Sequence, residues 1–410
     1  MGEGPVTESG SEPGDGGGRT VGGPSEHAGM RPVLKAGLRA VWRDRDTLQI
    51  GVDPRRAVAL SGMGDAGRVI SLLDGSRDWA GVVAAARDAG ISVKTVQRVL
   101  GLLAGAGALS DLPLATLNAL TPVTRGRIGT ELATASLTYG DSDGGARTLA
   151  RRRLAFVRVH GAGRIGAGVA GLLAAAGVGQ VVCRDGGLAG PQDLSPAGLG
   201  LADLDLPRAD GVVRVISRIA PDVQTADLGE RPDLAVLTEP GQPEQAAELT
   251  RAGIAHLAVA GAEGVAVVGP LVRPGRSACL RCLDLARSER DPAWPLILAQ
   301  LAGAGDGARD GSCDTVLAAT VAAQAAVQVL AFLDTGRPGR AVSDGAVELA
   351  VPDWQWRRRS WPPHPRCPCG AAGAAPTAHP AGATRKPGQV AGRPGVFSTV
   401  GMTENWKGER

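Results

Sequence analysis

Aromatic side chains are scarce in this chain of 410 residues: they make up 3% of it and include one tyrosine and three phenylalanines. Hydrophobic residues nevertheless reach 43%, so the core must consist mainly of alanine, valine and leucine. An excess of one charge is also missing, because 44 basic residues face 41 acidic ones and the net charge is +3. Without a strong field, the chain is expected to bind neither nucleic acid nor an anionic membrane.

Segments that would direct the chain into a membrane are lacking too. The N-terminus is acidic and glycine-rich, where a secretory signal needs positive charge followed by an apolar stretch. The best spanning candidate, residues 316–333, is rich in alanine and contains Gln324 and Gln328, so we predict a buried helix instead. Six cysteines are few for a disulfide framework, and four of them form two close pairs. This pattern favours metal binding in a reducing cytoplasm.

The stretch 155–185 carries the clearest pattern in the sequence. A short apolar run leads into Gly161, Gly163 and Gly166, which fit G-x-G-x-x-G, and an apolar segment of helical length and a second strand-like run follow. We expect these glycines to allow a tight turn, close approach to a phosphate, and packing of the helix on the strand. Asp185 stands 24 positions after Gly161, where a ribose-binding acid is expected. The stretch predicts a Rossmann-like α/β nucleotide-binding fold.

Residues 30–112 predict a small α+β domain. Asp53 and Pro54 indicate a hairpin between strand-like runs at 47–52 and 57–62. Three helices should follow, at 65–73, 78–87 and 92–104. This order is typical of a winged-helix-like module, which could serve packing, dimerisation or DNA binding. The last helix exposes only Lys94 and Arg98, so a DNA-binding regulator is a minor alternative.

The remaining segments differ in composition. Residues 1–29 and 371–410 are rich in small residues and proline without periodicity, so both are expected to be disordered tails. Residues 113–150 read as a connector with helical pieces. Strand and helix patterns alternate through 151–370, which predicts a mainly parallel sheet.

Two cysteine pairs predict a metal clamp. Cys279 and Cys282 form a C-x-x-C pair, and Cys367 and Cys369 form a C-x-C pair. Two such pairs can complete a closed shell of four sulfurs, which is a structural zinc site rather than a catalytic one. His364 could replace one sulfur, and ordinary reduced thiols are the alternative. The tryptophans that precede the second pair are expected to pack against this clamp.

With these features together, residues 155–370 resemble the ThiF/MoeB superfamily, the adenylyltransferases related to ubiquitin-activating enzymes. The shared order comprises the glycine loop, a strand ending in an acid, a helix between Pro207 and Pro221, the stretch GPLVRPG with the following CLRC, an alanine-rich helix and the second cysteine pair. The resemblance implies that ATP and magnesium bind at the glycine loop, where a carboxylate attacks the α-phosphate. It also suggests a homodimer.

Carried over residue by residue, the family's ATP site is only partly present. Asp185 keeps the ribose acid, while Arg208 takes the place of a phosphate-binding lysine and Glu239 that of a magnesium-binding aspartate. Arg208 and Glu239 are therefore the candidate catalytic residues. Gly187 replaces a second acid and Pro196 an arginine that meets the phosphates. Losing one group that stabilises charge around a reacting phosphate costs a factor of about 100, so we expect a degenerate site.

Cys313 lies in the region where some of these relatives carry a sulfur nucleophile. No histidine is close to it in sequence to activate the thiol. We therefore expect a structural cysteine.

The N-terminal module resembles the PqqD-type peptide-recognition domain of ribosomal-peptide modifying enzymes, on the hairpin, the stretch LLDGSRDWAGVV and the final helix. That resemblance implies that a leader peptide adds a strand to the sheet edge. Together the two resemblances imply a cytoplasmic protein that binds a precursor peptide for a YcaO-type cyclodehydratase. An active adenylyltransferase acting on a carrier protein or peptide C-terminus, and a nicotinamide oxidoreductase with the same glycine loop, remain open.

Overall fold

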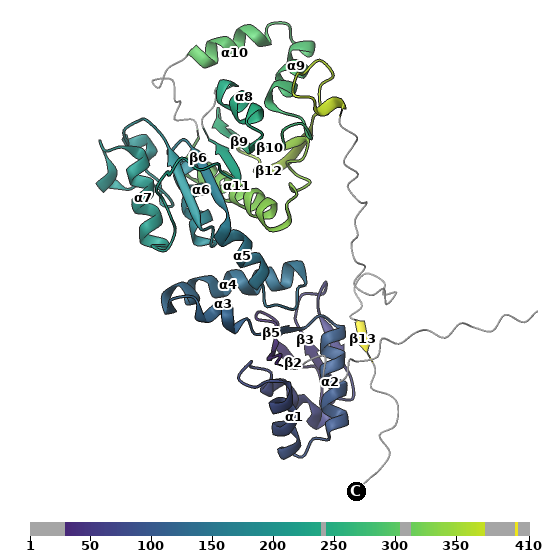
Figure 1. Ribbon diagram of the computed structural model, residues 1–410. Coiled ribbons are helices and arrows are strands. Elements are labelled where there is room, and N and C mark those ends of the chain that lie inside the picture. Colours follow the sequence, from purple (N-terminus) through teal and green to yellow (C-terminus); the bar gives the residue numbers. More distant parts are fainter. Residues whose placement is uncertain (1–28, 239–242, 304–312, 374–397, 401–410) are drawn as a thin grey trace, which may run out of the picture. The chain divides into compact units, whose positions relative to one another are not determined.

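The computed structural model describes residues 29–238, 243–303, 313–373 and 398–400. Within these ranges the chain forms two compact units (Figure 1). The first unit contains residues 29–112 and 398–400, and the second contains residues 113–373. Each unit buries a hydrophobic cluster of its own.

The first unit contains a four-stranded sheet in the order β13, β4, β3, β2. Its strands are β2 (Ala40–Trp42), β3 (Leu48–Ile50), β4 (Val58–Leu60) and β13 (Ser398–Val400). β2, β3 and β4 form an antiparallel meander in which Leu48 faces Leu60, so the hairpin predicted around Asp53 and Pro54 is confirmed. β13 pairs in parallel with β4 and comes from the segment expected to be a disordered tail.

A second, two-stranded sheet and three helices complete this unit. These elements are β1 (Pro32–Leu34), paired antiparallel with β5 (Leu109–Asp111), the 3-10 helix η2 (Gly64–Leu72), α1 (Trp79–Asp88) and α2 (Val93–Gly105). The three predicted helices are thus confirmed. Asp78 and Ser92 explain where α1 and α2 begin, because their side chains accept hydrogen bonds from the N–H groups of Gly81 and Thr95.

The second unit is built on a seven-stranded sheet in the order β12, β11, β10, β9, β8, β6, β7. Four strands run parallel to one another: β6 (Phe156–His160), β7 (Gln180–Arg184), β8 (Leu234–Leu237) and β9 (Ala255–Ala262). The sheet continues antiparallel with β10 (Val265–Val272), β11 (Gly345–Ala350) and β12 (Gln355–Ser360). The parallel half carries the glycine loop.

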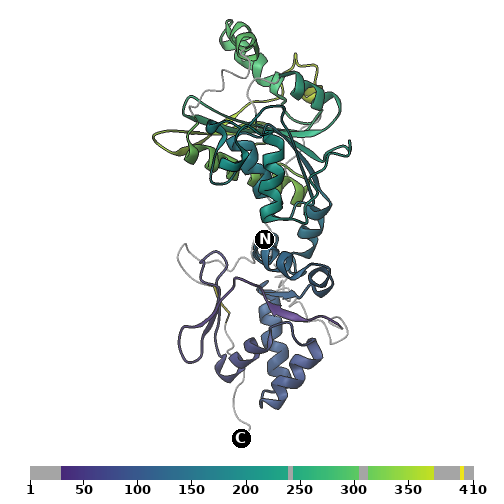
Figure 2. The same ribbon diagram turned by 90° about the vertical axis from the view of Figure 1, so that its left-hand side faces the viewer.

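Helices cover both faces of this sheet (Figures 1 and 2). One face packs on α6 (Arg164–Ala175), α7 (Arg208–Ile219) and α11 (Thr315–Thr335). The other packs on α8 (Pro243–Arg251) and α9 (Leu280–Arg290), and α10 (Trp294–Gly303) lies beside α9. Alternation along β8 explains the two layers, because Leu234 and Val236 join the first core while Ala235 and Leu237 join the second.

The predicted helix at 316–333 is present as α11 and lies in the core. Its residues Leu317, Val321 and Val329 are fully buried, and it packs against α6, β9 and β10. Among the described residues α11 is the one helix long and apolar enough to cross a membrane. Its packing against α6 and the sheet accounts for that composition, as the sequence predicted.

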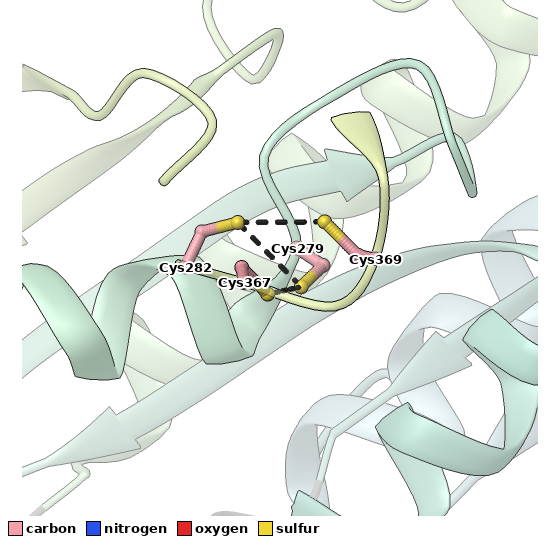
Figure 3. A group of neighbouring side chains, drawn as sticks. All are labelled: Cys279, Cys282, Cys367 and Cys369. Atoms are coloured by element: carbon pink, nitrogen blue, oxygen red, sulfur yellow. Dashed lines mark hydrogen bonds between the residues drawn. The ribbon is translucent and has the colours of Figure 1, made fainter. Parts of the chain in front are cut away.

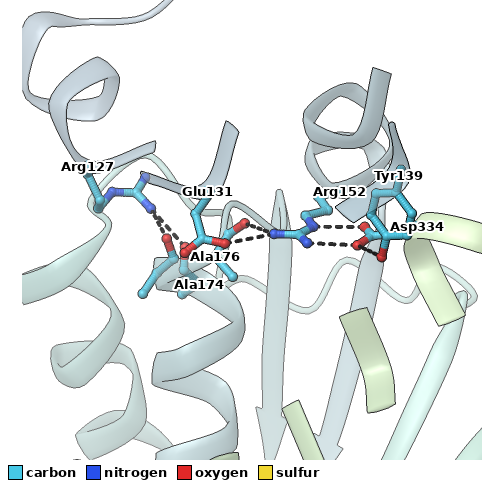
Figure 4. A network of polar contacts seen from close by, with 8 residues as sticks. Arg127, Glu131, Tyr139, Arg152, Ala174, Ala176 and Asp334 are labelled. Atoms are coloured by element: carbon cyan, nitrogen blue, oxygen red, sulfur yellow. Dashed lines mark hydrogen bonds and ion pairs between the residues drawn. The ribbon is translucent and has the colours of Figure 1, made fainter. Parts of the chain in front are cut away.

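The connector forms three helices, α3 (Leu114–Asn118), α4 (Pro122–Tyr139) and α5 (Ala146–Leu154), which belong to the second unit and are joined to the rest of it by buried charge. Arg152 of α5 holds both carboxylate oxygens of Asp334, at 2.8 and 2.7 Å, and donates to the Ala176 carbonyl at 3.1 Å (Figure 4). Tyr139 donates to the same carboxylate at 2.8 Å, and burial together with this bond raises the pKa of Tyr139 to about 12. The side chains of Arg152 and Asp334 are 9% and 1% exposed, so this pair fixes α5 against α11.

Candidate functional site

The glycine loop forms the strand-to-helix bend that its sequence predicts. Gly161 follows β6 with φ of +95°, which is a conformation that favours glycine. Gly163 precedes the first turn of α6. A Cβ atom at Gly166 would lie 1.9 Å from the carbonyl oxygen of Gly161, so only glycine permits this approach of helix and strand. The N-terminus of α6 consequently points its first N–H groups into the loop.

Asp185 lies at the end of β7 and is already surrounded by donors from the protein. One carboxylate oxygen accepts the Ala162 N–H at 2.7 Å, and the other accepts the Gly187 N–H at 2.7 Å. Arg208 donates to this second oxygen from Nε at 3.0 Å and from Nη2 at 2.8 Å. The side chains of Arg208 and Asp185 are 5% and 1% exposed. The structure therefore joins two predicted site residues in a buried ion pair.

Gly187 makes room for that ion pair. A Cβ atom at position 187 would lie 2.3 Å from Nη2 of Arg208, so any side chain there would displace the guanidinium. Asp193 lies on the other side of Arg208, with its carboxylate 3.5 Å from Nη1. The other oxygen of Asp193 is 3.4 Å from the ideal Cβ position of Gly163. A carboxylate thus stands beside the loop, a placement that the sequence did not reveal.

A second polar pair that the sequence analysis missed lies at the end of β6. Nδ1 of His160 is 2.6 Å from the amide nitrogen of Gln245 on α8. Burial, and then the positive charges of Arg158 and Arg184, lower the pKa of His160 to about 4, so its ring is neutral near pH 7. The only sequence signal was its position immediately before the glycine loop.

The other predicted residues of this region are placed differently. Glu239 lies outside the described residues. Pro196 is exposed in the turn that follows η3 (Pro191–Asp193). Cys313 is partly buried, with its sulfur 2.7 Å from the ideal Cβ position of Gly261. Burial, and then Asp314, raise the pKa of this thiol, which disfavours a nucleophilic thiolate.

The four predicted metal-binding cysteines come together in one cluster (Figure 3). The sulfurs of Cys279 and Cys282 are 3.8 Å apart, and Cys367 and Cys369 lie 3.6 Å from Cys279 and Cys282 respectively. All four sulfurs lie within 4.8 Å of one another. Zinc bound tetrahedrally at about 2.3 Å separates its sulfurs by about 3.8 Å. This spacing suits a four-sulfur zinc shell.

The clustered thiols differ in how readily they lose a proton. The hydrogen bond from Cys279 lowers the pKa of Cys282 to about 4, whereas burial raises that of Cys367 to about 11. The hydrogen bond to Cys282, and then burial, raise the pKa of Cys279. A metal ion would favour the thiolate at every position.

Two expectations about the surroundings of the cluster need correction. His364 is not placed to replace a sulfur, because Nε2 bonds to Glu289 at 3.0 Å and Nδ1 accepts the Arg366 N–H at 3.2 Å. Trp354 and Trp356 do not pack on the cluster, since they are 42% and 41% exposed. Trp361, at 6% exposure, belongs to the hydrophobic cluster that contains the cysteines. Trp361 immediately follows β12, whereas Trp354 and Trp356 lie at its start.

No family model and no curated protein matches the chain. Among solved structures, E. coli MccB with AMPCPP and MccA superposes with a TM-score of 0.60 and 14% identity, covering 83% of this chain and 100% of MccB. The microcin C7 biosynthetic enzyme MccB with N-formylated MccA gives a TM-score of 0.58 at 15% identity, covering 83% of this chain and 99% of MccB. PaaA gives a TM-score of 0.52 at 15% identity, covering 65% of this chain and 91% of PaaA. The chain has an MccB-like fold.

This likeness confirms the Rossmann-like, ThiF-type fold predicted for the second unit. It also reaches further along the chain. The range that contains the second unit, residues 113–373, makes up about two thirds of the sequence. A match to MccB over 83% of the chain must therefore include part of the first unit as well.

Proposed function

We propose that this protein binds a precursor peptide of a ribosomally made natural product and presents it to a modifying enzyme, a YcaO-type cyclodehydratase, in the cytoplasm. MccB, which has the same fold, was solved with N-formylated MccA, and an N-formyl group marks the start of a ribosomally made chain. The first unit would recognise the leader of the peptide as an added strand. The ATP site of the second unit would be degenerate.

The ion pair of Arg208 with Asp185 is the main observation that supports a degenerate ATP site. A ribose could reach Asp185 only by replacing donors that now surround it. Breaking a buried ion pair costs about 3–5 kcal/mol, whereas a hydrogen bond to a charged group contributes about 1.5–3 kcal/mol. The pair should therefore persist in the presence of nucleotide.

Asp193 adds an electrostatic argument. Its carboxylate stands beside Gly163, where the resemblance places a phosphate. Helix N-termini favour an anion, but a fixed negative charge at the same place repels a second one. Arg208 offsets this charge only while it bridges both acids.

Calorimetry of the full chain with ATP and MgCl2 tests the degenerate site. We expect no saturable heat up to about 1 mM ATP. The second candidate function, an active adenylyltransferase, is favoured by the structure of MccB with ATP. It requires micromolar binding and exchange of labelled pyrophosphate into ATP, and either result would overturn the degenerate site.

An Arg208→Ala variant separates the two functions by the sign of its effect. If Arg208 blocks the site, the variant binds ATP no more weakly than the parent chain. If Arg208 binds phosphate, the variant loses affinity at least tenfold. Arg214→Ala is the matched control, because Arg214 is half exposed and pairs with Asp203 at 2.7 Å outside the loop.

Peptide binding can be tested with a displayed library of random 20-residue peptides selected on the immobilised full chain. Enriched peptides would then be synthesised with a photoreactive residue. We expect their crosslinks to map to residues 30–112. Crosslinks confined to the second unit, or no enrichment, would contradict the proposed recognition.

We also propose that Cys279, Cys282, Cys367 and Cys369 hold one structural zinc ion. The sulfur spacing and the reduced state of the thiols support it. Elemental analysis of the purified chain should give one zinc per chain, and Cys282→Ser should lose it. Cys183→Ser is the control, because Cys183 lies outside the cluster and its substitution should leave the metal content unchanged.

A further inference from the structure

The outer edge of β4 in the first unit is occupied by a distant part of the same chain. β13 pairs in parallel with β4, with Ser398 opposite Val58, Thr399 opposite Ala59 and Val400 opposite Leu60 (Figure 1). The other side of β4 pairs with β3. Ser398 is separated from Gly373, the last described residue of the second unit, by residues 374–397.

We propose that the β4 edge is an acceptor for extended segments, and that residues 398–400 occupy it in cis as an intramolecular competitor. An outside peptide would then have to displace the chain's own strand. The inference rests on the proposed function only for the identity of that outside peptide.

The composition of β4 supports an acceptor role. Exposed sheet edges are usually protected by charged residues, proline or bulges, because their free N–H and C=O groups would otherwise recruit another strand. β4 consists of Val58, Ala59 and Leu60 and carries none of these protections. Ala59 and Leu60 are buried, at 1% and 0% exposure. An apolar edge of this kind is suited to being covered.

One of the two edge strands of the seven-stranded sheet, β12, provides a contrast within the same chain. β12 lies at the end of the seven-stranded sheet and is exposed along its length. It carries Arg357, Arg358 and Arg359 in succession. Such a charged strand has the features that prevent edge-to-edge pairing. The two edges are thus built differently, and β4 is the one that pairs.

Tethering explains how so short a strand can compete. A stretch of 24 residues, 374–397, joins the second unit to β13 and could span up to about 80 Å if extended. Joining two segments through a linker of this length gives an effective concentration on the order of millimolar. If the same segment, as a separate peptide, bound with a Kd of about 0.1 mM, the tethered segment would occupy the edge in about ten molecules for each one in which the edge is free. The strand is therefore retained without a partner but can be displaced by a tighter peptide.

The test uses a fluorescein-labelled synthetic peptide of residues 392–410 as probe and anisotropy as readout. The full chain is compared with a double variant, Ser398→Pro and Thr399→Pro, because proline removes backbone donors and does not fit a paired strand. Ala383→Pro places one proline between the units and is the matched control. We expect the double variant to bind the probe about tenfold more tightly than the parent chain and the control to match the parent. Equal binding by all three would overturn the inference.

Hydrogen exchange gives an independent readout on the same proteins. In the double variant, amides of Val58, Ala59 and Leu60 that pair with β13 should exchange at least tenfold faster than in the parent chain. In the parent chain, the protection of these amides from exchange must be the same at about 1 and at about 50 μM protein. Loss of protection on dilution would mean that strands are exchanged between copies, which would refute occupation in cis.

These outcomes are separable from the proposed function. If library peptides bind elsewhere while the double variant gains affinity for the probe, the proposed recognition fails and the occupied edge stands. If library peptides crosslink to residues 30–112 but bind the parent and the double variant equally, the recognition stands and the competition fails.

Discussion

Gly166 is the residue at which the glycine loop tolerates least change. Alanine would improve helix propensity by about 1 kcal/mol, but its Cβ would lie 1.9 Å from the Gly161 carbonyl. Overpacking typically costs about 1–3 kcal/mol, and more where backbone must move. We expect Gly166→Ala to lower the free energy of unfolding by about 2 kcal/mol or more in urea titrations. Gly186→Ala is the control, because nothing lies within 4 Å of its Cβ position. An equal change in the free energy of unfolding in both variants would contradict the prediction.

His160 should make the stability of the second unit depend on pH. Burial lowers its pKa to about 4 from an ordinary value of 6.5, so the unfolded chain takes up this proton first as pH falls. The stability that the neutral imidazole provides is fully present above pH 6.5 and is lost progressively between pH 6.5 and 4. This loss amounts to about 2 kcal/mol at pH 5. The loss on acidification from pH 7.5 to 5 should be smaller by that amount in His160→Gln. Equal losses in both proteins would show that the imidazole is not kept neutral. His256, whose pKa burial also lowers, is present in both and cancels.

At the residue scale, the sequence predicted where the site residues lie better than it predicted which residues they contact. The glycine spacing located the bend, and the spacing of the cysteine pairs located the cluster. Neither pattern could reveal that Arg208 turns onto Asp185, because that contact depends on the space left by Gly187 and on the path of the intervening chain. No sequence pattern indicated that Asp193 lies beside Gly163. A side chain's partner follows from packing, which no local pattern contains.

At the scale of elements, the buried pair between α5 and α11 should be a main determinant of stability. Arg152→Met would leave the carboxylate of Asp334 unpaired with 1% of its side chain exposed. Removing one partner of a buried ion pair costs about 3–5 kcal/mol. Arg153→Met, on the same helix, removes a pair with Asp222 in which the arginine is 39% exposed, and should cost at most about 1 kcal/mol. Thermal unfolding of the two variants in parallel checks the difference, and a similar effect of both would contradict it.

The helices that the sequence predicted best are long enough to show a period, whereas the three-residue strands β3 and β4 were predicted from the turn signal at Asp53 and Pro54. α1, α2, α6 and α11 have ten or more residues, and α1, α2 and α11 begin at capping side chains. β1, β2, β5 and β13 have three residues each, and an alternation of period two cannot be seen in three positions. β13 was missed for a further reason, since its pairing with β4 joins residues more than 300 positions apart. Only the folded unit brings them together.

At the scale of the whole molecule, the two units have separate hydrophobic clusters and different means of stabilisation. The first combines short strands with three helices over a core of leucine and valine. The second surrounds its sheet with helices and carries all four clustered cysteines. Each unit has the size of an independent domain, so each should respond to its own perturbation. This separation would allow the first unit and the glycine loop to change independently.

The final prediction follows from that separation. Calorimetry of the full chain should resolve two transitions, because two cores of this kind unfold as two cooperative units. If the cluster holds zinc as proposed, a chelator should lower the transition of the second unit alone, since a structural metal contributes its binding free energy to the unit that holds it. The double variant Ser398→Pro and Thr399→Pro should lower only the other transition, because β13 pairs within the first unit. A single transition that shifts under both treatments would mean that the units fold as one, and the cis strand would then stabilise the whole chain.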